Sequence, residues 1–136
     1  MTRVNAGIHP HELPRQLLLS EHREITRIPN AIRSGRAKIK GIPKQFKLGK
    51  GHVKFFYDKL GYLKNRYGSL LAECKRRGYN VTDKSSAFDE LPPNLMNDYL
   101  ASLNDRQLII QRFESRNFSL LNSDPCLNSE SINARE

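Results

Sequence analysis

Residues 53–78, VKFFYDKLGYLKNRYGSLLAECKRRG, decide the fold. Apolar side chains recur in this stretch at intervals of three and four residues, as on one face of an α-helix; they are Val53, Phe56, Leu60, Leu63, Tyr67, Leu70 and Cys74. The basic run 75–77 (KRR) suits a helix C-terminus, and Gly78 suits the position that follows it. We therefore predict a continuous helix over this stretch.

Two further helices are expected on either side of it. The first covers about 11–33, where Pro29 should kink the helix or break its hydrogen bonding near Ile25. The other covers about 100–118 and directs three apolar side chains inward, namely Leu103, Ile110 and Phe113. We expect an all-α fold, a compact single domain of three main helices with long connecting loops over residues 1–120. A polar, flexible tail over residues 121–136, rich in Asn and Ser, should follow it.

The charge of the chain is unevenly distributed. Residues 1–80 hold 18 Lys/Arg and 5 Asp/Glu, a balance of +13, whereas residues 81–136 hold 5 and 9, a balance of −4. This asymmetry predicts a polyanionic partner, with nucleic acid the first candidate and an anionic membrane surface the second. The chain has no apolar run long enough to span a bilayer, its N-terminus lacks the apolar stretch expected of a signal peptide, and it has only two cysteines, Cys74 and Cys126. These features are typical of a cytoplasmic protein.

The N-terminus offers a nucleophile. Thr2 follows Met1, and a residue as small as threonine favours removal of the initiator methionine in a bacterial-type cytoplasm. The Thr2 α-amine would then be free, and an α-amine titrates near about 7.7–8.0, against about 10.4 for a lysine side chain. Such an amine can attack a sugar carbon and form a Schiff base.

Glu24 is the strongest candidate for a catalytic acid or base. It lies on one helical stripe with the apolar Leu17 and Ile28, and Arg23 and Arg27 flank it. A carboxylate placed between apolar and cationic neighbours is typical of an active site. The same pattern also fits a surface glutamate that pairs with one of the two arginines.

Basic side chains of the N-terminal part are candidate phosphate ligands. Arg3, Arg23 and Arg27 carry the planar guanidinium that suits a phosphate, and a basic loop over residues 36–47 accompanies them. Solvated helix faces carry the same residue types, so that interpretation stays open. Because each neutralised phosphate releases counterions, binding through these residues should weaken steeply with salt.

The turn at 49–52 (GKGH) opens the predicted central helix, and we expect Lys50 and His52 within it to contact DNA. Its backbone amides would suit a phosphate, or its glycines would simply let the helix start tightly. His9 and His11 have no Cys or His partner at a matching spacing, so we predict no metal site.

Several segments resemble one known family. These are residues 2–5 (TRVN), 21–27 (EHREITR), 48–60 (LGKGHVKFFYDKL) and 72–80 (AECKRRGYN), with a weaker likeness at 98–99 (DY). Together they resemble the pyrimidine-dimer DNA glycosylases, the small phage-type endonuclease V enzymes. The likeness is strong over about 2–82 and faint over about 91–116.

The resemblance implies a function and a set of site residues. It implies an all-α glycosylase and AP lyase that repairs damaged double-stranded DNA and needs no metal or other cofactor. The family's nucleophile corresponds to the α-amine of Thr2, which forms a Schiff base at C1′ before β-elimination, and its essential glutamate corresponds to Glu24. Its phosphate-binding and base-flipping arginines correspond to Arg3, Arg23 and Arg27.

The likeness has departures. His22 stands where the family has a tyrosine, Thr26 stands where it has a proline, and its Trp/Tyr-rich C-terminal segment is not matched. Two alternative functions follow: a non-catalytic basic DNA-binding protein, or a glycosylase or AP lyase for a different modified base. We expect a monomer without membrane association, in the cytoplasm of a bacterial or phage-infected cell and associated with the nucleoid.

Overall fold

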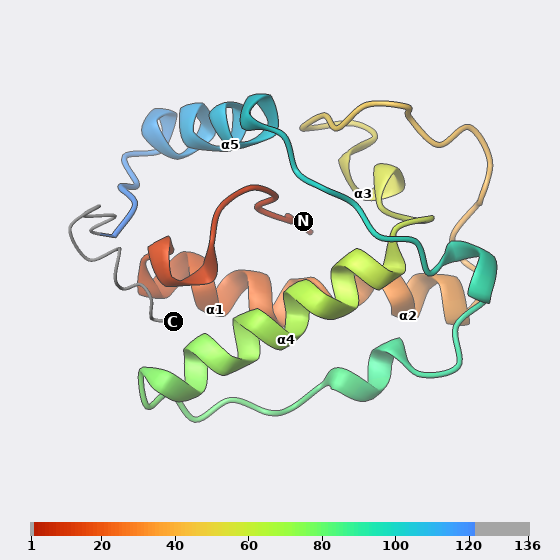
Figure 1. Ribbon diagram of the computed structural model, residues 1–136, viewed down its shortest axis with the longest axis horizontal. Helices are drawn as coiled ribbons and strands as arrows, with labels where there is room; N and C mark the ends of the chain where they lie inside the picture. Colours follow the sequence, from red (N-terminus) through yellow and green to blue (C-terminus); the bar gives the residue numbers. More distant parts are fainter. Residues whose placement is uncertain (1, 122–136) are drawn as a thin grey trace.

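The computed structural model describes residues 2–121, and these residues fold into helices joined by turns and loops (Figure 1). The α-helices are α1 (Arg15–Glu24), α2 (Arg27–Arg33), α3 (His52–Phe55), α4 (Leu60–Arg76) and α5 (Leu103–Ser115). Short 3-10 helices are η1 (Pro10–Glu12), η2 (Ser85–Phe88) and η3 (Pro93–Leu95). The expected all-α class is confirmed, whereas the predicted tail, apart from its first residue, lies outside the described part of the chain.

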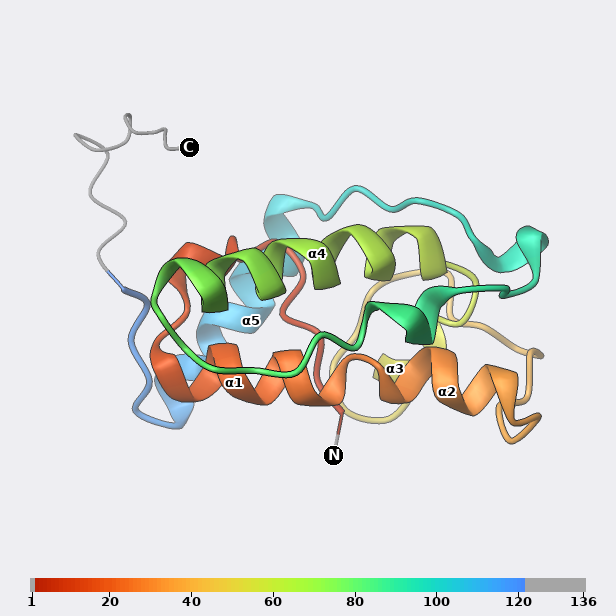
Figure 2. The same cartoon turned by 90° about the horizontal axis from the view of Figure 1, so that it is seen from below.

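Helix α4 packs against α1 and also contacts the short helices η1 and η2. Figure 2 shows α1 and α2 lying end to end, with α4 running alongside them in the opposite direction. Figure 1 shows α5 on the far side of the N-terminal segment, which therefore lies between α5 and the α1–α4 pair. The core that joins these elements includes the fully buried Leu18, Ile25, Leu63, Tyr67 and Leu70.

The predicted break near Ile25 is found between α1 and α2. Pro29 has no backbone N–H, so it cannot donate to the carbonyl of Ile25. The N–H of Ile28 approaches that carbonyl instead, at 3.4 Å, and α2 begins at Arg27. The start of α1 is later than predicted, at Arg15, because the preceding Pro14 has an extended backbone.

The prediction of one continuous central helix is wrong. Helix α3 ends at Phe55 and α4 begins at Leu60. Phe55 and Phe56 are 1% and 0% exposed and meet edge to face, with ring centroids 5.1 Å apart. Successive helix residues point about 100° apart, so a helix with one buried face favours burial of only one of the pair. The turn between the helices buries both rings.

The prediction for the C-terminal helix is right in place and partly wrong in orientation. Helix α5 is shorter than expected, and its first residue, Leu103, is 81% exposed rather than inward. Ile109 takes the fully buried position, and Phe113 is buried as predicted. Ser102 precedes the helix as its N-cap in a capping box. Its side chain accepts from the N–H of Asp105, and the Asp105 carboxylate accepts from the N–H of Ser102.

Candidate active site

The N-terminal segment, residues 2–8, is held by side chains from separate helices. The contacts are Val4 N–H to His52 Nε2 at 2.9 Å, Asn5 Nδ2 to Glu21 Oε1 at 2.7 Å, Arg66 Nη1 to the Ile8 carbonyl at 2.9 Å, and Arg106 Nη1 to the Gly7 carbonyl at 3.1 Å. The partners lie on α3, α1, α4 and α5 respectively. The segment is therefore fixed in position relative to all four helices.

A buried ion pair lies beneath this segment. The side chains of Glu21 and Arg66 are 1% and 7% exposed, and Arg66 donates from Nε and Nη2 to the Glu21 carboxylate. Burial opposes the charge of Arg66, but the adjacent Glu21 carboxylate raises its pKa overall. Asn5 supplies a further donor to the carboxylate. Because removing one partner of a buried pair leaves an uncompensated charge, loss of either Glu21 or Arg66 would strongly destabilise the contact between α1 and α4.

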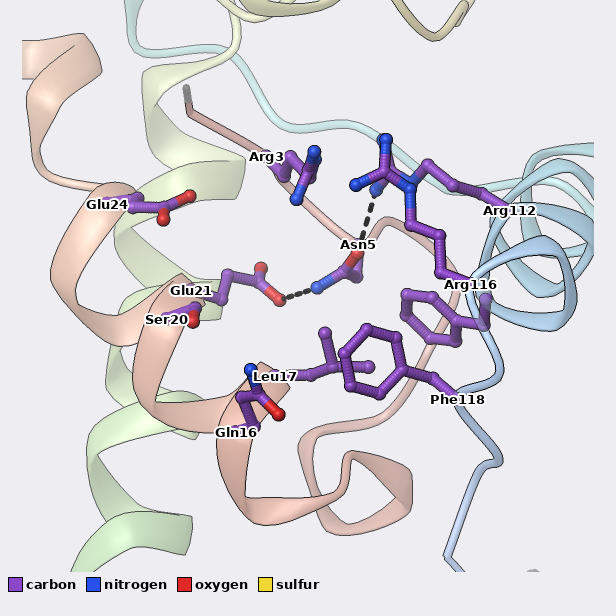
Figure 3. Close-up of a pocket in the computed structure, with 11 residues that line it drawn as sticks. Arg3, Asn5, Gln16, Leu17, Ser20, Glu21, Glu24, Arg112, Arg116 and Phe118 are labelled. Carbon is purple, nitrogen blue, oxygen red and sulfur yellow. Dashed lines mark hydrogen bonds between the residues drawn. The ribbon is translucent and has the colours of Figure 1, made fainter.

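A pocket of about 100 Å³ opens beside the segment, with room for several water-sized groups. Its lining residues are Arg3, Asn5, Gln16, Leu17, Ser20, Glu21, Glu24, Arg112, Phe113, Arg116 and Phe118. Figure 3 shows the polar residues of α1 along one wall, with arginines on the facing side and Leu17 and Phe118 at one end. The pocket thus combines carboxylates, guanidinium groups and a small apolar surface.

The facing wall of the pocket carries an excess of positive charge. Burial, together with the nearby charges of Arg3 and Arg116, lowers the pKa of Arg112 to about 10. Arg112 Nη2 donates to Asn5 Oδ1 at 3.0 Å, whereas the buried Nε of Arg3 has no hydrogen-bond partner among the described residues. A bound anion would relieve this mutual repulsion, and a phosphate matches guanidinium geometry.

The sequence pattern did not single out Arg112 and Arg116 as site residues. Residues 81–136 hold only five Lys/Arg, and three of them, including this pair, lie within the predicted C-terminal helix. That local concentration of positive charge was the available signal. Nothing in the local sequence indicates that α5 folds back against Arg3.

Glu24 occupies the last position of α1, on the wall opposite the arginines. Its side chain is 15% exposed and lies 3.9 Å from Nη2 of Arg23, whose side chain is 58% exposed. An ion pair at this distance, with one exposed partner, contributes little to stability. The carboxylate therefore remains available to a group that enters the pocket.

The structure brings two predicted site residues, Arg3 and Glu24, into one pocket. Four others are outside its lining, namely Thr2, Arg23, Arg27 and Lys50. Thr2 is half-buried and directly precedes Arg3, so it lies at the edge of the site. The remaining three are exposed, on α1, on α2 and in the turn before α3.

His52 does not present a free nitrogen to a ligand. Its side chain is buried at 3% exposure, Nε2 accepts from Val4, and Nδ1 lies 2.9 Å from the Lys47 carbonyl. Both ring nitrogens are thus engaged with backbone groups, and the expected contact of His52 with DNA has no free polar atom in this geometry. The glycine-rich turn serves the helix start, because Gly51 adopts φ +92° immediately before α3.

The part of the chain that the structure describes, residues 2–121, contains no cluster of three or more His, Cys, Asp or Glu side chains that could hold a metal ion. None of its helices combines the length and the apolar character needed to cross a bilayer.

An all-α domain with an arginine-rich pocket beside a fixed N-terminal segment defines a basic, nucleic-acid-binding type of protein. The family model of the pyrimidine dimer DNA glycosylases matches residues 1–86, and the chain belongs to this family. The protein is accordingly a DNA repair glycosylase with DNA as its substrate. The match includes α1 to α4, whereas α5, which supplies Arg112, lies beyond it.

Proposed function

We propose that this protein removes pyrimidine dimers from double-stranded DNA and also cleaves the strand as an AP lyase, with the Thr2 α-amine as the nucleophile. One observation supports this most directly: Arg3, the residue after Thr2, lines the same pocket as Glu24. Because consecutive Cα atoms are about 3.8 Å apart, a nucleophile on Thr2 lies at the rim of that pocket. The resemblance to the pyrimidine-dimer DNA glycosylases likewise assigns Thr2 and Glu24 to catalysis.

The proposed reaction begins once Met1 has been removed. The unprotonated Thr2 amine attacks C1′ of the damaged nucleotide, the C1′–N bond breaks, and the base leaves with the bonding electrons and a proton. The sugar ring then opens as the C1′–O4′ bond breaks and O4′ takes up a proton, which leaves an iminium at C1′ that acidifies the C2′ protons. Removal of one of these protons expels the phosphate from C3′ by β-elimination, and water then hydrolyses the imine to free the enzyme. We assign Glu24 to stabilising the cationic sugar and to moving protons in these steps.

The arginines supply the binding energy in this proposal. Arg3, Arg112 and Arg116 would contact phosphates beside the extruded nucleotide. The exposed Arg23, Arg27 and Lys50 would contact the backbone further out, consistent with the +13 balance of residues 1–80. A damaged step costs less to unstack and extrude than an intact one, which would favour the lesion.

The decisive experiment is reductive trapping on a duplex that contains one abasic site. With borohydride we expect a covalent protein–DNA adduct that maps to Thr2. Selective acetylation of the terminal amine should abolish the adduct, and so should a preparation that retains Met1. Glu24→Gln should bind the duplex normally and lose cleavage, because the amide preserves size without charge. If no adduct forms with any of several lesions, the Schiff-base step at Thr2 and the AP lyase activity are refuted.

A substrate comparison tests the lesion. Ultraviolet-irradiated plasmid and abasic plasmid should both be nicked, whereas untreated plasmid should stay closed. Nicking of abasic plasmid alone would refute the assignment to pyrimidine dimers. It would favour an AP lyase or a glycosylase for a different modified base.

A further inference from the structure

We infer that His52 is a positioning residue that holds the N-terminal segment, and with it the Thr2 amine, in the reactive place, and that it releases the segment when its ring is protonated. This inference rests on the proposed function of Thr2. His52 would contact no part of the DNA and would act only through the backbone of Val4.

The hydrogen bonds of His52 fix its tautomer. A backbone N–H can only donate, so Nε2, which lies 2.9 Å from the Val4 nitrogen, must be the unprotonated acceptor. A carbonyl can only accept, so Nδ1 carries the proton and donates to Lys47 at 2.9 Å. The neutral ring therefore satisfies both contacts. The protonated ring would place a second N–H against that of Val4.

Because Val4 lies close to the N-terminus, its hydrogen bond to His52 limits where the terminus can lie. Val4 follows Thr2 by two residues, and two residues reach at most about 7 Å. Of the hydrogen bonds described for residues 2–8, the one to His52 is nearest the terminus. Asn5, which is held by Glu21 and Arg112, lies one residue further away.

The surroundings of the ring favour its neutral form. Phe46 and Phe56 each meet it edge to face, with centroids 5.5 Å away. The charged groups that face it are Arg3 from the N-terminal segment, Glu21 from α1 and Arg112 from α5. Burial lowers the pKa of His52 and the two arginines add to this effect, whereas the Lys47 carbonyl and Glu21 oppose it.

The test uses two substitutions and reductive trapping on abasic duplex. His52→Phe keeps an aromatic ring between its neighbours and removes the acceptor, whereas His52→Gln offers an amide oxygen as acceptor. At pH 8 and saturating DNA, we expect His52→Phe to form the adduct about 10-fold to 100-fold more slowly, as misplaced reacting groups do. His52→Gln should stay within about 3-fold of wild type. The dissociation constant for DNA should change less than about 2-fold in both variants.

The pH profile separates positioning from a purely structural role. Protonation of the amine alone lowers the adduct rate about 10-fold per pH unit in acid. In wild type, a plot of the logarithm of the adduct rate against pH should steepen from a slope of about 1 toward about 2 at pH values below the pKa of His52. His52→Gln has no titrating ring at this position and should keep a slope of about 1. Equal slopes in the two proteins would overturn the inference.

A matched control addresses stability. Phe46→Leu disturbs the packing around the same ring but leaves the bond to Val4 in place, so it should lower the melting temperature without slowing the adduct. A normal rate in His52→Phe, or equal slowing in both His52 variants, would also overturn the inference. Absence of any adduct in wild type would refute the proposed function of Thr2 instead, so the two failures are distinguishable.

Discussion

Two charged residues at the junction of α1 and α2 occupy helix ends where the backbone dipole disfavours them. Glu24 is the last residue of α1, where the dipole is negative, and Arg27 is the first residue of α2, where it is positive. Because α1 and α2 lie end to end, their opposite dipole ends offset one another, and each placement costs less than the roughly 0.3–1 kcal/mol of an isolated helix end. Natural sequences break such local rules mainly at functional sites, so these placements agree with a role in binding or catalysis.

Among single side chains, the arginines that line the pocket (Arg3, Arg112 and Arg116) predict how DNA binding depends on salt. Arg116→Ala should reduce the slope of log binding constant against log salt by about one, because one phosphate contact is lost. Arg76→Ala is the matched control, since Arg76 also lies at a helix C-terminus and is outside the pocket. Titrations at several salt concentrations measure both slopes. Equal slopes in Arg116→Ala and Arg76→Ala would contradict the prediction.

Individual residues were predictable where their signal was local. Glu24 stood out because charged neighbours flank it on an apolar stripe, and the structure places it with Arg3 in one pocket. The contact of Val4 with His52 joins residues 48 positions apart. Local periodicity carries no information about such a pair, which is why His52 was assigned to DNA instead.

Among the elements, α4 depends on close approach at one of its two glycines. A Cβ at Gly61 would lie 2.7 Å from the carbonyl oxygen of Met96, whereas a Cβ at Gly68 would meet nothing within 4 Å. The backbone of α4 and the segment that leads to α5 therefore touch directly at Gly61. Lys59 and Met96 form an isolated β-bridge beside this contact.

The two glycines make opposite predictions for the same substitution. Gly61→Ala should destabilise the fold by about 1–3 kcal/mol, because the clash is with backbone. Gly68→Ala should stabilise it by up to about 1 kcal/mol, the ordinary helix preference for alanine. Urea unfolding midpoints measure both effects. Shifts in the same direction would show that the contact at Met96 does not constrain α4.

Helices were predictable from sequence to the extent that one buried face determined them. The apolar spacing from Leu60 to Cys74 predicted α4, and the missing backbone N–H of Pro29 predicted the break between α1 and α2. The separation of α3 from α4 was missed because Phe56 continues the same spacing while its ring packs in a turn. Leu103 was misplaced because it lies on the side of the first helical turn that faces solvent, whereas Asp105 of the same turn is buried.

Across the whole molecule, two buried histidines link stability to pH. His22 is 4% exposed and lies 2.9 Å from the hydroxyl of Tyr67, and His52 is 3% exposed. Burial lowers the pKa of both rings below the ordinary value of 6.5. The unfolded chain therefore binds protons more readily than the folded one as pH falls below 6.5.

The melting temperature should consequently fall in two stages as pH decreases. The first begins near 6.5, where the unfolded histidines take up protons. The second begins near 4.5, because ion pairs with arginine hold the pKa values of Glu12 and Glu73 below that value despite the burial that opposes them. Thermal scans from pH 8 to pH 3 measure the profile. His52→Gln should reduce the first stage, and an unchanged profile in that variant would contradict this account.

The hydrogen bond from Val4 to His52 also bears on the removal of the initiator methionine. Every residue left in front of Thr2 pushes the leading nitrogen outward by up to about 3.3–3.6 Å, while Val4 stays where it is. On the proposed chemistry, a newly translated chain that keeps its start residue is folded yet inert. Removal of that start residue is, on the same chemistry, what makes the chain able to cleave DNA.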